Sequence, residues 1–426
     1  MEAAPHPRPG QAGAGKVVSF PPVMRTMART CLGWSAVLLG LLALSGCNSE
    51  GYPENLEYRQ RSDPLVTEPP QIQPTSFDNP GQFPHFLEDP NYPLLKVPGL
   101  VRFPRDIDAD KLDEIQEGLK ALFGTPREPR LDRATRRALK LSQAQLEEGS
   151  TLYRLHCVHC HGLPGDGRGP TAPWINPHPR DFRQGIFKFT SSRQDLGVRK
   201  PRRRDLLRTV REGIEGTAMP SFKELQTADE DIDKIISYVI HLSLRGQTEF
   251  KIMKDLLTPG SEVGKISTAL RRNLAAFARQ WVDAENNPIV PPEEYPYPYP
   301  VQPADDHDGV LGDSVRNGQE IFKDSKRGGC MSCHFDYGRQ GPYYYDNWGT
   351  IVRPMDLTKG VYRGGRRPID LYYRIHSGIN GSNMASLLDV EGETPKDREK
   401  RIWDLINFLQ VLPYPEMRKK YDIKLD

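Results

Sequence analysis

The chain has few cysteines and little net charge, and it lacks a long apolar segment. Only six of its 426 residues are cysteine, and four of these lie in two short clusters, so the sequence has no disulfide framework. The 58 Lys and Arg residues nearly balance the 56 Asp and Glu residues, which argues against nucleic acid as a partner. The apolar run at residues 32–44 is shorter than the about 20 residues that span a membrane.

Both cysteine clusters are followed directly by histidine. Residues 157–161 read C-V-H-C-H and residues 330–334 read C-M-S-C-H, so both fit the pattern C-x-x-C-H. In this pattern the two cysteines bond covalently to haem and the histidine supplies a nitrogen to the iron. A zinc site or a disulfide also uses paired cysteines, but the wide separation of the pairs and the histidine after each favour haem. The sequence therefore predicts two covalently bound haem c groups, attached through Cys157, Cys160, Cys330 and Cys333 and ligated by His161 and His334.

Residues 1–46 are predicted to be an export signal. Arg25 and Arg29 precede the apolar run, which ends at Leu44-Ser45-Gly46-Cys47, and Cys31 lies inside the signal. This ending resembles the bacterial lipobox, so we expect cleavage before Cys47 and acyl chains on that cysteine. Ordinary cleavage near Gly46 and an uncleaved anchor are the alternatives. The prediction is a lipid-anchored protein on the periplasmic side of a bacterial membrane.

Two parts of the chain repeat one another. Each copy has a glycine and an aromatic residue before the cysteine motif, and Asp205–Met219 matches Asp370–Met384 without a gap. Each copy also closes on an apolar segment with helical spacing, at 235–239 and 405–409. The repeat predicts two related domains, at residues 141–245 and 310–426.

The segments outside the repeats are predicted to lack a core of their own. Residues 47–140 are rich in proline and contain one predicted helix near 108–123 that ends at Gly124. This segment could be a spacer from the lipid or an extended arm that orders on a partner. Residues 246–309 are predicted to be a linker, with an amphipathic helix at 261–284 followed by a polyproline-like strut at 291–300.

Each haem iron needs a second axial ligand, and a methionine is available in each repeat. Met219 lies in a glycine-containing turn of the first copy, whereas Met355 and Met384 compete in the second. Because Met384 falls opposite Met219 in the repeat, we predict that Met384 binds the second iron and that Met355 is a packing residue. Methionine sulfur favours Fe(II) and raises the reduction potential.

Two basic clusters occupy corresponding places in the repeats, at 199–204 and 363–367. They could be solvated loops, contacts to the haem carboxylates, or a docking surface for an acidic redox partner. Four histidines near the predicted ligands are expected not to bind iron: His156, His159, His178 and His376.

Both repeats resemble class I cytochrome c domains, which are all-α. The residues that carry the resemblance are the two C-x-x-C-H motifs and the methionine turns, of which the first reads Gly216-Thr217-Ala218-Met219-Pro220. The stretch 162–170 further resembles cytochrome c subunits of bacterial respiratory complexes. The second copy departs from the pattern, since Phe335 replaces the usual glycine after the haem histidine and Ala385 follows the methionine.

The resemblance implies outer-sphere electron transfer between redox protein partners. The sequence thus predicts an all-α, membrane-tethered di-haem cytochrome c that serves respiratory-chain partners, either as a free carrier or as a subunit of a complex. A di-haem enzyme such as a peroxidase is the alternative, and it would need one iron with an open position and an acid–base residue nearby. A methionine in register for both irons favours the carrier.

Overall fold

The computed structural model describes residues 56–74, 89–223, 228–291, 299, 309–387 and 389–425. The predicted export signal, Cys47 and most of the polyproline-like strut lie outside these residues. The described residues fall within one compact unit, Leu56–Asp426. The described residues are 50% helix and 4% strand and form no large sheet, so the all-α prediction is confirmed. Within the described ranges, none of the helices is both long enough and apolar enough to cross a membrane.

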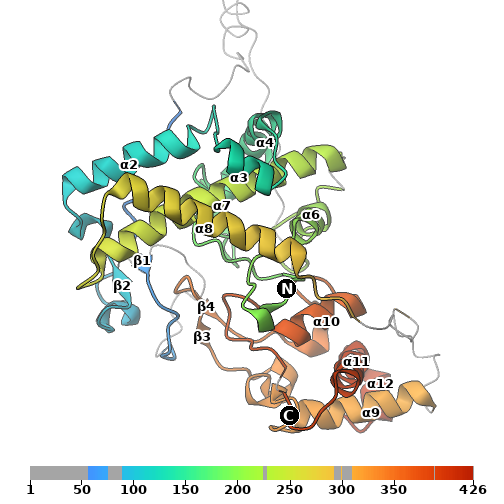
Figure 1. Ribbon diagram of the computed structural model, residues 1–426. Coiled ribbons are helices and arrows are strands. Elements are labelled where there is room, and N and C mark those ends of the chain that lie inside the picture. The colour runs from blue at the N-terminus through green and yellow to red at the C-terminus, as the bar shows by residue number, and fades with distance from the viewer. Residues whose placement is uncertain are drawn as a thin grey trace, which may run out of the picture. The chain divides into compact units, whose positions relative to one another are not determined.

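The first helix group is built around the crossing of α4 (Gln143–His156) and α7 (Asp229–Leu257) (Figure 1). α4 begins at a capping box, in which the Gln145 N–H donates to Ser142 Oγ over 3.0 Å. The helices cross at Gly149, where an added Cβ would lie 2.0 Å from the Lys234 carbonyl, so the close approach requires glycine. The group also contains α5 (Val158–His161) and α6 (Arg203–Glu212).

The second helix group repeats this crossing with α9 (Val310–Lys323) and α11 (Pro395–Val411). At Gly318 an added Cβ would lie 2.0 Å from the Asp404 carbonyl, and the Phe322 and Phe408 rings pack below it with centroids 5.4 Å apart. Two further helices belong to this group: α10 (Pro368–Ser377) and α12 (Pro415–Lys420). The predicted repeat therefore has the same helix crossing in both copies.

The N-terminal segment and the linker each contribute helices to the first group. α2 (Ala109–Phe123) and α8 (Ile266–Asn286) confirm the two predicted helices, and α2 ends at Gly124 with φ 71°. α8 runs beside α7 and also packs on α2 and α3 (Arg133–Ala138) (Figure 1). α7 itself continues to Leu257, past the predicted boundary at residue 245. The first core thus includes side chains from outside the predicted domain.

The described parts of the proline-rich segment are packed on the rest of the chain. Neither of the two predictions, a spacer from the lipid or an arm that orders on a partner, included this packing. The Tyr58 and Tyr238 hydroxyls lie 2.7 Å apart in the first core, and Tyr92 OH donates to the Gly349 carbonyl over 3.1 Å. Tyr92 belongs to an apolar cluster that joins this segment to Tyr345 and Trp348 of the second group. The segment therefore contacts both helix groups.

Strands are short in the described structure. β1 (Leu65–Val66) pairs with β2 (Val101–Arg102), and β3 (Tyr344–Tyr345) pairs with β4 (Ile351–Val352), both antiparallel. Single turns of 3₁₀ helix complete the connections, at Pro93–Lys96, Pro104–Asp106, Ala172–Trp174, Gln194–Leu196, Cys330–Ser332 and Leu357–Lys359. Phe335–Gly338 is a tight loop in which Asp336 and Tyr337 are not helical.

The two helix groups meet through reciprocal contacts. A Cβ at Gly216 would lie 2.8 Å from Val361, and a Cβ at Gly381 would lie 2.7 Å from Ile186. Gly216 corresponds to Gly381 in the repeat, and Ile186 corresponds to Val361. Each copy thus presents the same glycine turn to the same aliphatic residue of the other, as in an interface with two-fold symmetry.

Corresponding residues also meet each other at this interface. Phe189 and Gly364 each lie three residues after the aliphatic residue of their copy. A Cβ at Gly364 would lie 2.5 Å from the Phe189 ring. The phenyl ring therefore occupies the space that a side chain at Gly364 would need.

Candidate haem sites

Each C-x-x-C-H motif forms one tight helical turn. In the first copy the His161 N–H donates to the Cys157 carbonyl over 2.9 Å, and in the second the His334 N–H donates to the Cys330 carbonyl over 2.8 Å. The thiols of all four motif cysteines are free. One turn of backbone thus carries two free thiols and an imidazole in both copies, which is the arrangement that covalent haem attachment requires.

The His161 imidazole is held by its neighbours in a neutral form. Its Nδ1 is hydrogen-bonded to the Arg180 carbonyl over 3.1 Å, and the ring stacks on Phe182 with centroids 4.7 Å apart. Burial lowers the pKa of His161 to about 4, so the ring is neutral near pH 7. With Nδ1 engaged by a carbonyl, Nε2 is the nitrogen left for a metal.

His334 has a corresponding partner with weaker geometry. Burial lowers the pKa of His334 to about 4, and the Met355 carbonyl acts in the opposite direction. The approach of this carbonyl to Nδ1 falls short of a full hydrogen bond. Met355 occupies the repeat position of Arg180, so both copies place a backbone carbonyl from the same position beside the motif histidine.

The two methionine turns share one hydrogen-bond pattern. In each copy an isoleucine N–H donates to the methionine carbonyl, and the methionine N–H donates to a hydroxyl two residues earlier. Both methionine side chains are half-buried. The pattern joins Ile214, Thr217 and Met219 (3.1 Å for both bonds) in the first copy and Ile379, Ser382 and Met384 (2.9 and 3.2 Å) in the second.

The donor set at each copy suits haem. A neutral imidazole and a thioether are axial haem ligands, and two free thiols can hold the porphyrin edge. Met219 packs with Leu207 and Val210 against the first core, which gives the apolar surroundings that a porphyrin needs. In the described part of the chain, no three His, Cys, Asp or Glu side chains gather closely enough to hold a metal ion by themselves.

The first basic cluster is largely tied to its own chain. Lys200 is buried, its Nζ donates to the Gly185 carbonyl over 2.6 Å and to Gln247 Oε1 over 2.5 Å, and burial lowers its pKa to about 7. Arg203 donates to Asp233 over 2.6 Å. These two members hold backbone and helices in place rather than forming a solvated loop.

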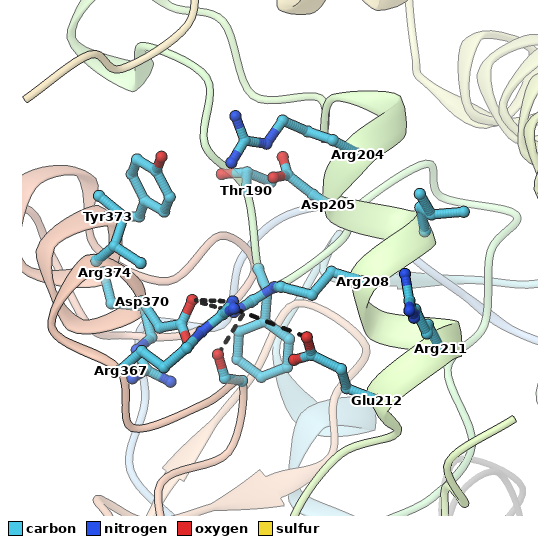
Figure 2. A pocket seen from close by; sticks show the side chains of 14 residues that line it. Thr190, Arg204, Asp205, Arg208, Arg211, Glu212, Arg367, Asp370, Tyr373 and Arg374 are labelled. Carbon is cyan, nitrogen blue, oxygen red and sulfur yellow. Dashed lines mark hydrogen bonds and ion pairs between the residues drawn. The ribbon is translucent and has the colours of Figure 1, made fainter. Parts of the chain in front are cut away.

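The second basic cluster takes part in charge pairs between the two copies. A cavity of about 200 Å³ lies between α6 and α10 and is lined by charged side chains from both (Figure 2). Arg208 of α6 donates to Asp370 of α10, and Arg367 lies 3.8 Å from Glu212 (Figure 2). The sequence reading missed these pairs, because their partners are far apart along the chain.

The remaining histidines lie in varied surroundings. The His156 ring packs edge-on against Phe222 with centroids 6.0 Å apart, and His159 is exposed. His376 stacks on Tyr372, and His178 lines a second cavity between the two copies.

A buried charge network from the N-terminal segment supports the first motif. Asp63 accepts two hydrogen bonds from Arg183, at 2.7 and 2.8 Å, and Arg183 also donates to Asp181 over 2.8 Å. Burial would raise the pKa of Asp63, but the Arg183 and Arg61 guanidinium groups lower it well below its usual range. Asp181 follows Arg180 directly, so this network anchors the loop whose carbonyl meets His161. Nothing local in the sequence around Asp63 signals this role.

Comparison with known proteins identifies part of the chain. None of the curated proteins compared with it is similar enough to count as a relative. A chain of the reducing HAO-like protein complex of Kuenenia stuttgartiensis is 22% identical, and the similarity covers 62% of this chain and 96% of that chain with a TM-score of 0.41. Residues 144–239 match the family model described as cytochrome C oxidase, cbb3-type, subunit III. The chain therefore contains a cbb3-type cytochrome c domain, which implies covalently bound haem c and electron transfer through haem.

Proposed function

We propose that the chain is a di-haem c-type cytochrome that passes electrons between respiratory redox partners from the periplasmic side of a bacterial membrane, where lipid on Cys47 tethers it. The observation that carries the proposal is that residues 310–426, beyond the family match, repeat the hydrogen bonds of the first motif and its methionine turn. In this proposal the chain has two cytochrome c domains, at 141–245 and 310–426.

Each haem would be held by the residues that the sequence predicts. Cys157 and Cys160 would bond the first porphyrin and Cys330 and Cys333 the second. His161 and Met219 would ligate the first iron, and His334 and Met384 the second. When bound, haem supplies an iron that alternates between Fe(II) and Fe(III). The chain keeps both imidazoles neutral, orients His161 with the Arg180 carbonyl and fixes the methionines in tight turns. With two protein ligands on each iron, no position would be open to a substrate, and the haems would supply electron transfer without making or breaking bonds.

Haem content and optical spectra of the holoprotein test the proposal. We expect two haems per chain and the weak long-wavelength band that Met-to-Fe(III) coordination gives, with Met219→Ala and Met384→Ala each losing half of it. The reduction potential of the altered haem should decrease, because methionine ligation raises it. The size of the decrease should be less than the about 0.8 V that a change of axial ligand can produce. Met355→Ala is the matched control, since Met355 is predicted to be a packing residue and the substitution keeps the backbone carbonyl beside His334, so the full band should remain.

Two results would contradict the proposal. One haem per chain would remove the second site, and a high-spin iron that binds cyanide or peroxide in the unmodified protein would favour the di-haem enzyme instead. The tether is tested separately by cell fractionation. The unmodified protein should sediment with membranes, and Cys47→Ala should release it.

A further inference from the structure

A path of close contacts leads from the first haem motif into the second copy. It begins at Arg180, whose carbonyl is hydrogen-bonded to His161 Nδ1 over 3.1 Å. The Arg180 side chain extends into the other copy, where its guanidinium carbon lies 3.6 Å from the centroid of the Trp348 ring. Both residues line the second cavity, which has a volume of about 650 Å³. One residue therefore touches the histidine of one copy and an indole of the other.

The Trp348 indole is fixed by groups from both copies. Trp348 is 2% exposed, and its backbone N–H donates to Asp346 Oδ1 over 3.0 Å. Lys188 of the first copy donates to the other oxygen of Asp346 over 3.4 Å. The guanidinium above the ring adds a cation–π contact, which is favourable when it is shielded from water.

The far edge of the indole lies against the second methionine turn. A Cβ at Gly381 would lie 2.7 Å from Trp348 Cη2, and the Asn347 N–H donates to the Gly381 carbonyl over 3.1 Å. Gly381 precedes Ser382, whose hydroxyl accepts from the Met384 N–H. The contacts thus run without a gap from the imidazole of one predicted site to the methionine turn of the other.

The reciprocal side of the interface has no aromatic counterpart in the described residues. Gly216, before Met219, faces the aliphatic Val361. Trp174, which corresponds to Trp348 in the repeat, is 81% exposed. The π contact therefore exists in one direction only.

We propose that Arg180 and Trp348 form the electronic route between the two haem sites, from the His161 side of the first to the Met384 side of the second. This inference rests on the proposed di-haem function. One electron would pass along the route, so that one iron would be oxidised from Fe(II) to Fe(III) as the other is reduced from Fe(III) to Fe(II), with no bond broken and no proton transferred. The warrant is the unbroken series of contacts, in which a hydrogen bond joins His161 to Arg180 and the Arg180 guanidinium packs on the Trp348 ring.

Inter-haem electron equilibration in the holoprotein tests the route. One haem is photoreduced in a flash, and the redistribution of the electron is followed at wavelengths that separate the two haems. We expect Trp348→Leu to slow equilibration, because it removes the aromatic ring between Arg180 and the second methionine turn. Trp348→Phe should slow it less, because an aromatic ring remains. Arg180→Gln should also slow it, although the hydrogen bond to His161 uses the backbone and is retained.

Val361→Ala is the matched control, because it loosens the reciprocal contact and leaves Trp348 in place. It should keep the equilibration rate of the unmodified protein. Haem content, the methionine band, equilibrium potentials and thermal unfolding are measured for every variant, so that a loss of fold or ligation is recognised. Should Trp348→Leu fail to load haem, Trp348→Phe and Arg180→Gln decide the outcome.

The failure of this inference is distinguishable from the failure of the proposed function. Two haems per chain with an unchanged rate in the Trp348 and Arg180 variants would overturn the route and leave the di-haem function standing. An equal slowing in Val361→Ala would also overturn it, because the effect would then follow from the interface as a whole. One haem per chain would remove the proposed function itself, and the route with it.

Discussion

The backbone that follows His161 differs from the backbone that follows His334, although both come after the same five-residue motif. In the first copy Gly162 adopts φ 73° and ends the turn, a conformation that costs glycine little. In the second copy Phe335 stands in its place, and Asp336 and Tyr337 adopt φ 45° and 55°. Such left-handed residues cost about 1–2 kcal/mol each when they are not glycine.

Side chains hold the second loop where glycine shapes the first. Arg339 pairs with the buried Asp336 over 2.8 Å, and the Tyr337 ring stacks on Phe322 with centroids 5.7 Å apart. The comparison shows that one motif can be supported by different loops, provided that buried contacts offset the strain. It also shows that the shared parts of the two copies are the helix crossing and the methionine turn, so substitutions there should act alike in both.

The largest expected effect is at the helix crossings. Gly149→Ala and Gly318→Ala would each place a Cβ 2.0 Å from a backbone carbonyl, which has little freedom to move. We expect each to lower the free energy of unfolding by about 3 kcal/mol, near the upper end for overpacked sites. Urea denaturation measures this. Gly264→Ala is the control, since its Cβ would meet nothing within 4 Å. If only one of the crossing variants is destabilised, the two copies do not share the crossing.

A difference between the copies is expected at two of their carboxylates, of which Asp63 is buried and Asp356 is partly exposed. Asp63→Asn breaks a buried pair with Arg183 and should cost about 3 kcal/mol. Asp356, which corresponds to Asp181, lies 3.7 Å from the exposed Lys359, and Asp356→Asn should cost about 1 kcal/mol or less.

The pH dependence of unfolding checks the assignment to Asp63. Because its pKa is lowered in the folded state, its contribution is present above the usual carboxyl pKa of about 4 and is lost as pH falls through the folded pKa. The loss of stability on acidification should therefore be shallower in Asp63→Asn than in the unmodified protein. If the free energy of unfolding decreased with the same slope at low pH in both proteins, the ion pair would not contribute to the pH dependence of stability.

The smallest expected effect is at the charged contact between the copies. Arg208 is partly exposed, and Asp370 keeps Arg367 as a partner over 2.9 Å when Arg208 is removed. We expect Arg208→Ala to cost about 1 kcal/mol in low salt and less in high salt, as for partly exposed pairs. Arg211→Ala, which breaks a pair within the first copy, is the control. Denaturation at two salt concentrations measures both. An effect of Arg208→Ala that salt leaves unchanged would contradict an electrostatic contact.

Local patterns predicted the helices and the methionine turns, because both depend on residues close together in the chain. The spacing of apolar residues predicted α2 and α8, the glycines predicted the turn around Met219, and the repeat placed Met384 in a corresponding turn. The packing of the proline-rich segment could not be predicted in this way. Asp63 meets Arg183 across 120 positions, and Tyr58 meets Tyr238 across 180. The composition of a segment indicates whether it can fold by itself. These contacts depend instead on the surface of the first helix group, which forms from residues far along the chain.

The contact between Phe189 and Gly364 shows what joining two copies in one chain permits. Where two identical subunits meet on a two-fold axis, a residue on the axis faces the same residue of the other subunit. The two side chains therefore always have the same size. Two phenylalanines would collide here, and two glycines would leave a hole. A chain that contains both copies does not have this constraint, since a large side chain in one copy can face a glycine in the other. The same freedom lets each half change its own surroundings separately, while the surface along which they meet stays filled.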